Sequence, residues 1–261
     1  MTRVTDLPAP AALPGAQRGA EADLARLLAK LRCPRCGAAG VPHPEGPRCP
    51  AGHVFSAPVP AAHARRPWGE RVFDHPQALG AKVALLSLLN GIPRGSLDHL
   101  TAGAEVLDLG CGSYQFHYRP EHAALRLGID LSARCVATAN RLYGRSLHLR
   151  ASLADPLPFA DGSFDVVLLL SVLHHLPRAI VPGVLAEAAR VARRELLVLD
   201  HTRSDVGWQR AIQQKYWDTC DGGDLYRSNA EWDQLLAPYR VTGRRRLGVL
   251  FRNVCLYRLA M

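Results

Sequence analysis

The sequence predicts an α/β protein built on a parallel sheet. Apolar, strand-like runs recur at residues 105–109, 125–130, 147–151, 164–170 and 195–200. Helix-like stretches such as 132–143 and 182–193 lie between them. Strands that alternate with helices in this way fold into a parallel sheet with helices on both faces. Two further strand-like runs, 239–249 and 252–259, have no helix between them and predict a terminal hairpin.

The first strand-like run ends in a glycine turn, and the second ends in an acid. Asp108 lies just before Gly110-Cys111-Gly112, and Asp130 follows Gly112 by eighteen positions. The carboxyl ends of neighbouring strands in an open α/β sheet form a crevice for nucleosides, where a carboxylate can accept from both ribose hydroxyls. The turn lacks the third glycine of a dinucleotide fingerprint. Asp108 would repel a pyrophosphate, so the pattern favours a cationic ligand.

Four segments, in this order, resemble the class I S-adenosylmethionine-dependent methyltransferases. They are Val106 to Gly112, Gly128 to Ser132, Pro156 to Val167 and Ser171 to Leu176. The resemblance covers roughly residues 97–261. It implies a Rossmann-like, seven-stranded sheet whose last strand inserts antiparallel, and it implies S-adenosylmethionine as the cofactor.

The resemblance also implies the cofactor-binding residues. Gly110 and Gly112 would line the methionine end, and Asp108 would help to hold the turn and the ammonium group, unless it is only a structural turn acid. Asp130 would accept hydrogen bonds from the ribose hydroxyls. The alternative is that Asp130 is a helix N-cap, although Ser132 is better suited to that role. The expected set is Asp108, Gly110, Gly112, Tyr114, Asp130, Leu131, Ser152, Leu153 and Ser171.

Two positions depart from the family pattern. Leu153 stands where the family usually has an acid that accepts from the adenine amine, so Ser152 or the Leu153 backbone would replace that contact. Tyr114 stands where the family generally has glycine, so its ring would cover the cofactor or narrow the pocket. Asp155 is expected to point to solvent.

Two histidines are the candidate catalytic residues. His174 and His175 follow the fourth strand-like run. Imidazoles titrate near neutrality, so either could take a proton from the methyl acceptor; the alternative is that both only pack or orient the loop. Asp200-His201 ends the fifth run, at the rim where an acceptor would lie. The aromatic segment from Trp208 to Tyr226, with Asp221-Gly222-Gly223, predicts either a lid or an ordinary amphipathic helix.

A cysteine-rich segment precedes the α/β region. Cys33 and Cys36 are followed by Cys49 and His53, with His43 as a substitute for the last. Two close pairs joined by a short loop are typical of a tetrahedral, structural zinc site. The alternative is free cysteines. The spacing resembles that of ribosomal RNA guanine-N1 methyltransferases over residues 31–56, but it departs from them over residues 54–60.

Composition sets the expected organisation and partners. The formal net charge is +9, which can indicate a nucleic-acid partner, although the charge is carried mostly by arginine. No apolar run approaches the ~20 residues of a membrane span. We expect a disordered tail (1–20), a zinc ribbon (21–60), a linker with a packing helix (61–96) and a methyltransferase domain (97–261). The first residues lack a signal-peptide pattern, so the expected compartment is the cytoplasm.

The sequence therefore predicts a methyltransferase that transfers a methyl group by direct displacement to a small molecule. The His174-His175 segment and the aromatic segment favour that acceptor. Ribosomal RNA base methylation is the first alternative, because of the cysteine spacing and the charge. A non-enzymatic protein that retains the fold is the second, because of Tyr114 and the missing adenine acid. The oligomeric state is left open.

Overall fold

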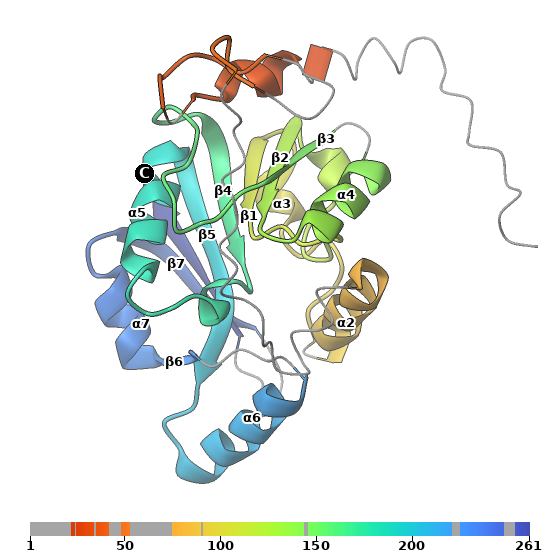
Figure 1. Cartoon of the computed structure of the whole chain (residues 1–261). Helices are drawn as coiled ribbons and strands as arrows, with labels where there is room; N and C mark the ends of the chain where they lie inside the picture. The colour runs from red at the N-terminus through yellow and green to blue at the C-terminus, as the bar shows by residue number, and fades with distance from the viewer. Residues whose placement is uncertain are drawn as a thin grey trace, which may run out of the picture.

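A computed structural model gives the fold of the chain (Figure 1). It describes residues 22–23, 25–33, 35–41, 48–52, 75–89, 91–143, 146–220, 225–247 and 254–261. Several predictions lie outside these residues: the tail 1–20, His43, His53, residues 61–74 of the linker and Asp221-Gly222-Gly223.

A single sheet forms the centre of the molecule. Its strand order is β3-β2-β1-β4-β5-β8-β7. The bounds are β1 Glu105–Leu109, β2 Leu125–Asp130, β3 Ser146–Arg150, β4 Phe164–Leu170, β5 Ala192–Arg203, β7 Arg240–Leu247 and β8 Val254–Ala260. Strands β1 to β5 are parallel, and β8 inserts antiparallel between β5 and β7. This confirms the predicted seven-stranded arrangement; a two-residue strand, β6 (Arg227–Ser228), pairs with the end of β5 and was not expected.

Helices cover both faces of the sheet (Figure 1). The α-helices are α2 Pro76–Leu89, α3 Asp98–Thr101, α4 Ala133–Leu142, α5 Val181–Val191, α6 Gly207–Cys220 and α7 Asn229–Leu236. Leu107 and Leu109 of β1 join the core beneath α5 and α7, whereas Val106 faces the opposite core with Leu97 and Tyr118. This alternation follows from the two-residue period of a strand. Among the helices of the described residues, none is both long and apolar enough to cross a bilayer.

The connection between β1 and β2 is unusual for an α/β unit. Residues 110–124 are all described and contain one 3-10 helix, η3 (Pro120–His122), but no α-helix. Helix α2 lies beside α4 (Figure 1). Ser132 caps α4 by accepting from the Cys135 backbone N–H, as expected from the sequence.

The N-terminal helix (residues 22–23 and 25–30) packs on the edge where the parallel strands begin, here called the amino edge. Its leucines Leu27 and Leu28, with Leu31, are buried in the same core as β1 and β4. Lys30 Nζ donates to Glu105, the first residue of β1, at 2.9 Å and to the Ser163 carbonyl before β4 at 2.5 Å. The N-terminal segment and the sheet therefore share one core.

Candidate functional site

The glycine turn lies where β1 ends, at the opposite, carboxyl edge of the sheet. Gly110 and Gly112 have φ angles of +72° and +57°, in the left-handed region that glycine adopts without strain. The Gly112 N–H donates to Asp130 Oδ2 at 2.8 Å, and the Ser132 N–H donates to Oδ1 at 2.8 Å. One carboxylate at the end of β2 therefore fixes both the turn after β1 and its own loop.

The loop after β4 lies against the same turn. A Cβ atom on Gly110 would be 2.4 Å from Cγ2 of Val172, so only glycine fits this approach. Ser171 has a φ of +55°, and its N–H donates to the Leu199 carbonyl at 2.7 Å. A non-glycine residue in this region stores strain, which often marks functional loops. The predicted residues Gly110, Asp130 and Ser171 thus converge at the carboxyl edge.

Asp108 has partners that the sequence prediction did not include. Its Oδ2 accepts from the Tyr118 hydroxyl at 2.9 Å and from Arg126 Nη2 at 3.1 Å. Its Oδ1 is buried and has no hydrogen-bond partner among the described residues. Burial raises the pKa of Asp108, although Arg126 and Tyr118 act in the opposite direction. Arg126 interrupts an apolar strand sequence, which was the signal that could have revealed this buried pair.

The other expected cofactor residues also lie near the carboxyl edge. The region of this edge where we expect the cofactor is here called the cofactor crevice. Leu131, Ser152 and Leu153 are half-buried and follow the ends of β2 and β3. Asp155 is exposed, as predicted. Tyr114 lies against α2: a Cβ atom on Gly80 would be 3.1 Å from the Tyr114 Cβ.

A buried histidine–aspartate pair lies beside the crevice, between the ends of β4 and β5. His174, in the 3-10 helix η4 (Leu173–His175), places Nδ1 2.5 Å from Asp200 Oδ1. Asp200 also accepts from the backbone N–H of Leu173 at 2.9 Å and of His201 at 2.7 Å. Burial acts to raise the pKa of Asp200, but His174 and His201 outweigh it and hold the pKa below its usual value. Asp200 is therefore a carboxylate that orients His174.

Aromatic rings enclose this pair. His174 stacks on Tyr226 with centroids 5.2 Å apart, and Tyr226 stacks on Trp217 at 3.6 Å. His201 meets His174 edge to face at 5.0 Å. Trp217 belongs to α6 and is buried, so the predicted aromatic segment does reach the pair. His175 is half-buried, with its ring 4.1 Å from that of His174.

The sequence placed Asp200 at the rim of the site but did not pair it with His174. Asp200 carries the same sequence signal as Asp108 and Asp130, an acid at the end of an apolar strand. Arg227 was missing from the predicted site. Arg227 in β6 is buried and lies over the Trp232 ring, and its positive charge interacts with the negative charge of Asp200. Arg227 could not be found from the sequence, because β6 has only two residues.

Three of the four predicted metal ligands come together. The sulfur atoms of Cys33, Cys36 and Cys49 lie within 4.8 Å of one another, and those of Cys36 and Cys49 are 3.7 Å apart. A tetrahedral zinc ion with Zn–S bonds of about 2.3 Å separates its sulfur ligands by about 3.8 Å. The three thiols therefore fit a zinc ion. The cluster lies at the amino edge, where the Arg32 N–H donates to the Pro158 carbonyl at 2.6 Å.

Comparison with known proteins agrees with this geometry. Residues 107–198 match the family described as a methyltransferase domain. This part of the chain, which runs from β1 into β5, is therefore similar to a methyltransferase domain.

Curated relatives match the same part of the chain. The 27-O-demethylrifamycin SV methyltransferase of Amycolatopsis mediterranei (strain S699) is 39% identical over 101 residues, 36% of each chain. The demethylmenaquinone methyltransferase of Tropheryma whipplei (strain Twist) is 34% identical over 96 residues, 36% of this chain and 39% of the relative. The match thus spans well under half of each of these relatives.

Solved structures share the fold over a larger part of the chain. The magnesium protoporphyrin IX methyltransferase ChlM from Synechocystis PCC 6803, with bound SAH, has a TM-score of 0.50 and 18% sequence identity. The alignment covers 78% of this chain and 89% of that one. Similarity at this level shows that the two chains share a fold.

Proposed function

We propose that the protein is an S-adenosylmethionine-dependent methyltransferase that acts on a small molecule. One observation carries the proposal: the glycine turn held by Asp130 and the buried histidine–aspartate pair both contact the loop after β4, at the carboxyl edge of the sheet. The curated relatives support the acceptor class, since their names give demethylated rifamycin SV and demethylmenaquinone as substrates.

The crevice residues fit the cofactor. The Gly112 and Ser132 N–H groups hold the Asp130 carboxylate at the end of β2. A carboxylate offers about four acceptor sites on its two oxygens, so Asp130 would also accept hydrogen bonds from the ribose hydroxyls. The positive φ angles of Gly110 and Gly112 keep side chains away from the methionine end. Asp108 Oδ1 supplies an acceptor for an ammonium group, directly or through water. Leu131, Ser152, Leu153 and Ser171 complete the lining.

The cofactor supplies an activated methyl group, and the chain positions the acceptor and removes its proton. Asp200 accepts a hydrogen bond from His174 Nδ1–H, which leaves Nε2 as the basic nitrogen of that ring. Nε2 is therefore the atom that would take a proton from the acceptor group. In-line positioning contributes to the rate independently of this base. His175, half-buried beside His174, would orient the acceptor.

The cysteine cluster fits a structural zinc ion, with His53 as the fourth ligand. Four protein ligands close a zinc site and leave no position for a substrate. Metal analysis of the purified protein should find one zinc per chain, and Cys36→Ser should lose it. Protein that is folded but free of metal would contradict the assignment.

RNA methylation finds less support in the geometry. The cysteine spacing suggested RNA as the acceptor, but the N-terminal segment that carries these cysteines packs on the amino edge of the sheet (Figure 1). His174 lies in the turn that follows the carboxyl end of β4. A ribbon at that edge would not present a base to His174.

Two measurements test the proposed function. Calorimetric titration with S-adenosylmethionine should give one site per chain, with competition by the demethylated product. Incubation of a lysate with radiolabelled cofactor, followed by separation into RNA, protein and small molecules, should place the label in the small molecules. Label in RNA would support the alternative acceptor, and absence of cofactor binding would support a non-enzymatic protein.

A further inference from the structure

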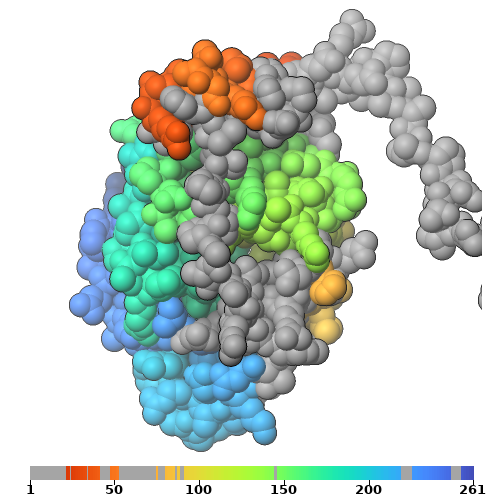
Figure 2. All heavy atoms as spheres, viewed as in Figure 1, coloured from red at the N-terminus to blue at the C-terminus, as the bar shows by residue number. Residues whose placement is uncertain are grey.

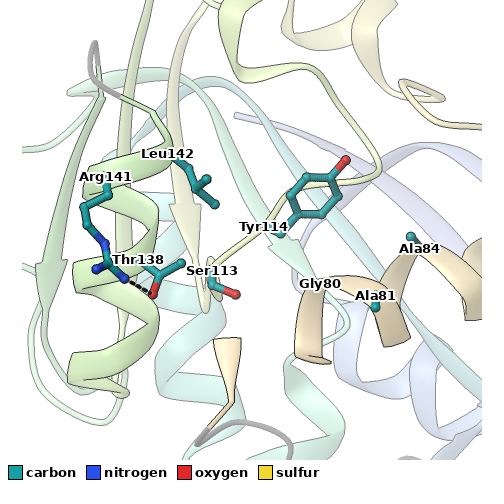
Figure 3. Close-up of a pocket in the computed structure, with 8 residues that line it drawn as sticks. All are labelled: Gly80, Ala81, Ala84, Ser113, Tyr114, Thr138, Arg141 and Leu142. Atoms are coloured by element: carbon teal, nitrogen blue, oxygen red, sulfur yellow. Dashed lines mark hydrogen bonds between the residues drawn. The ribbon is translucent and has the colours of Figure 1, made fainter. Parts of the chain in front are cut away.

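A pocket lies between α2, α4 and the β1–β2 connection. Its volume is about 560 Å³, within the range of small-molecule sites. Figure 3 shows its walls: small residues of α2, Ser113 and Tyr114 of the β1–β2 connection, and the last turns of α4. Because α4 runs back from the carboxyl edge, its last turns lie away from Asp130 and His174. Of the predicted cofactor residues, only Tyr114 lines this pocket.

The pocket exists because of two local features. The connection between β1 and β2 has no α-helix to fill the space beside α4. Helix α2 contributes only small residues to the wall, Gly80, Ala81 and Ala84. Because Gly80 has no side chain, Tyr114 can approach the helix closely. A Cβ atom placed on Gly80 would lie 3.1 Å from the Tyr114 Cβ.

The apolar surface continues past the pocket along one face of α2. Ala81, Ala84, Leu85 and Leu88 follow the spacing of a single helical stripe. Leu85 and Leu88 are 57% and 60% exposed, and Leu142 on the α4 wall is 57% exposed. Large exposed leucines beside a pocket indicate a surface that an apolar ligand covers.

A positively charged side chain, Arg141, lines the same pocket. Arg141 is exposed, and Nη2 donates to Thr138 Oγ1 at 3.3 Å. Among the residues that the structure describes, no carboxylate pairs with Arg141. Arg94 adds a second positive charge 5.9 Å from the centroid of the Tyr114 ring. The site therefore combines an apolar wall with positive charge and hydroxyl groups.

We propose that this pocket is a second ligand site that takes an amphipathic carboxylic acid. The apolar chain lies along Ala81 and Ala84 and extends toward Leu85, and the carboxylate pairs with Arg141. Arginine pairs with carboxylates through charge-assisted hydrogen bonds. The ligand would contact Tyr114, two residues from Gly112, so its binding should also alter the affinity of the cofactor crevice.

Calorimetric titration of the full chain with decanoate tests the site, with decylamine as the ligand of matched length and opposite charge. We expect one decanoate site per chain and weaker binding of decylamine. Arg141→Gln should weaken decanoate binding about tenfold, the size of one charged hydrogen bond. Ala84→Trp should abolish it by filling the pocket. Arg210→Gln, an exposed arginine on α6, is the control and should bind normally.

Three results would overturn the proposal. The first is no saturable decanoate binding, and the second is equal binding of decylamine. The third is a concentration-dependent dimer in sedimentation that Leu85→Gln dissociates, because a second copy would then cover the stripe. Circular dichroism shows whether Ala84→Trp folds; if it does not, Arg141→Gln on the exposed surface carries the test. Cofactor titration of each variant separates this site from the proposed methyl-transfer function.

Discussion

The two edges of the sheet are built from different interactions. At the amino edge, charged groups are only partly buried: Glu105 pairs with Arg26, Lys30 and Arg193 around buried leucines. At the carboxyl edge, Asp108 and Asp200 are fully buried and held by dedicated partners. Buried polar groups are costly to desolvate and add little stability. The amino edge therefore combines apolar burial with partly exposed ion pairs, and the carboxyl edge, where we propose that methyl transfer occurs, concentrates buried charge.

Surface ion pairs alone do not explain the stability of the amino edge. Exposed pairs typically contribute 0 to about 1 kcal/mol each. The burial of Leu27, Leu28 and Leu31 contributes about 1.5–3 kcal/mol per side chain. The ion pairs around Glu105 therefore define where the N-terminal helix docks, while the leucines supply most of the free energy.

The largest expected effect is on catalysis at the carboxyl edge. His174→Gln should lower the methyl-transfer rate about 100- to 10,000-fold by removing the base, about 3–5 kcal/mol of barrier. Cofactor affinity by calorimetry should not change. His99→Gln, an exposed histidine on α3, is the control. An unchanged rate, or a rate loss that only follows weaker cofactor binding, would contradict the role of His174.

At the amino edge the expected effect is on stability. Leu31 is fully buried, so Leu31→Ala should lower the free energy of unfolding by about 2–5 kcal/mol in urea titration. Methyl transfer per folded molecule should stay the same. Ile212→Ala, at an exposed position on α6, should change stability by less than about 0.5 kcal/mol. If Leu31→Ala left stability intact but removed activity, the proposed division between the edges would fail.

A smaller effect is expected for cofactor affinity. Asp130→Ala removes a charged hydrogen-bond acceptor and should weaken binding by about 1–3 kcal/mol in calorimetry. Part of this loss comes from the Gly112 N–H, which would lose its partner. Asp155→Ala is the matched control, because Asp155 is exposed. Equal affinity of Asp130→Ala and the parent would rule out the ribose contact.

The smallest expected effect is a dependence of stability on pH. Burial, with a contribution from His201, lowers the pKa of His117 to about 4. The unfolded chain takes up this proton below about pH 6.5 and the folded chain does not, so stability should fall as pH decreases from 6.5 to 4. For one such histidine, the free energy of unfolding should fall by about 1 kcal/mol for each pH unit in this range.

Urea titrations across this pH range check the effect by comparing His117→Gln with the parent protein. The variant should show a shallower loss of stability. The pKa values of Glu105 and Asp165 at the amino edge are lowered, because their ion pairs and hydrogen bonds outweigh burial. Those groups begin to lose their contribution as the pH falls to the ordinary carboxyl pKa, and they lose it completely below their lowered pKa in the folded protein. Because the variant and the parent share this loss, only the difference between their profiles reports on His117. Parallel pH profiles for variant and parent would show that His117 is not buried in neutral form.

Most of the elements could be predicted from local sequence. The alternation of apolar runs and helices identified β1 to β5, α4 and α5, and the final pair of runs identified β7 and β8. Asp130 and the glycine turn were found because an acid and glycines at strand ends have a local signature. Arg227 has no such signature, since its role depends on β6 pairing with the end of β5. The opposite placement of the cysteine cluster and His174 also depends on the fold.

The sequence by itself determined which segments form strands, where the turns lie and which residue types could bind a nucleoside or a metal. Periodicity, glycine content and cysteine spacing are local properties, so they can be read along the chain. The tertiary structure decided which side chains meet: Asp200 with His174, Arg126 with Asp108, and the N-terminal leucines with the amino edge. These contacts join residues far apart in sequence, and their energies depend on burial, which exists only once the sheet has formed.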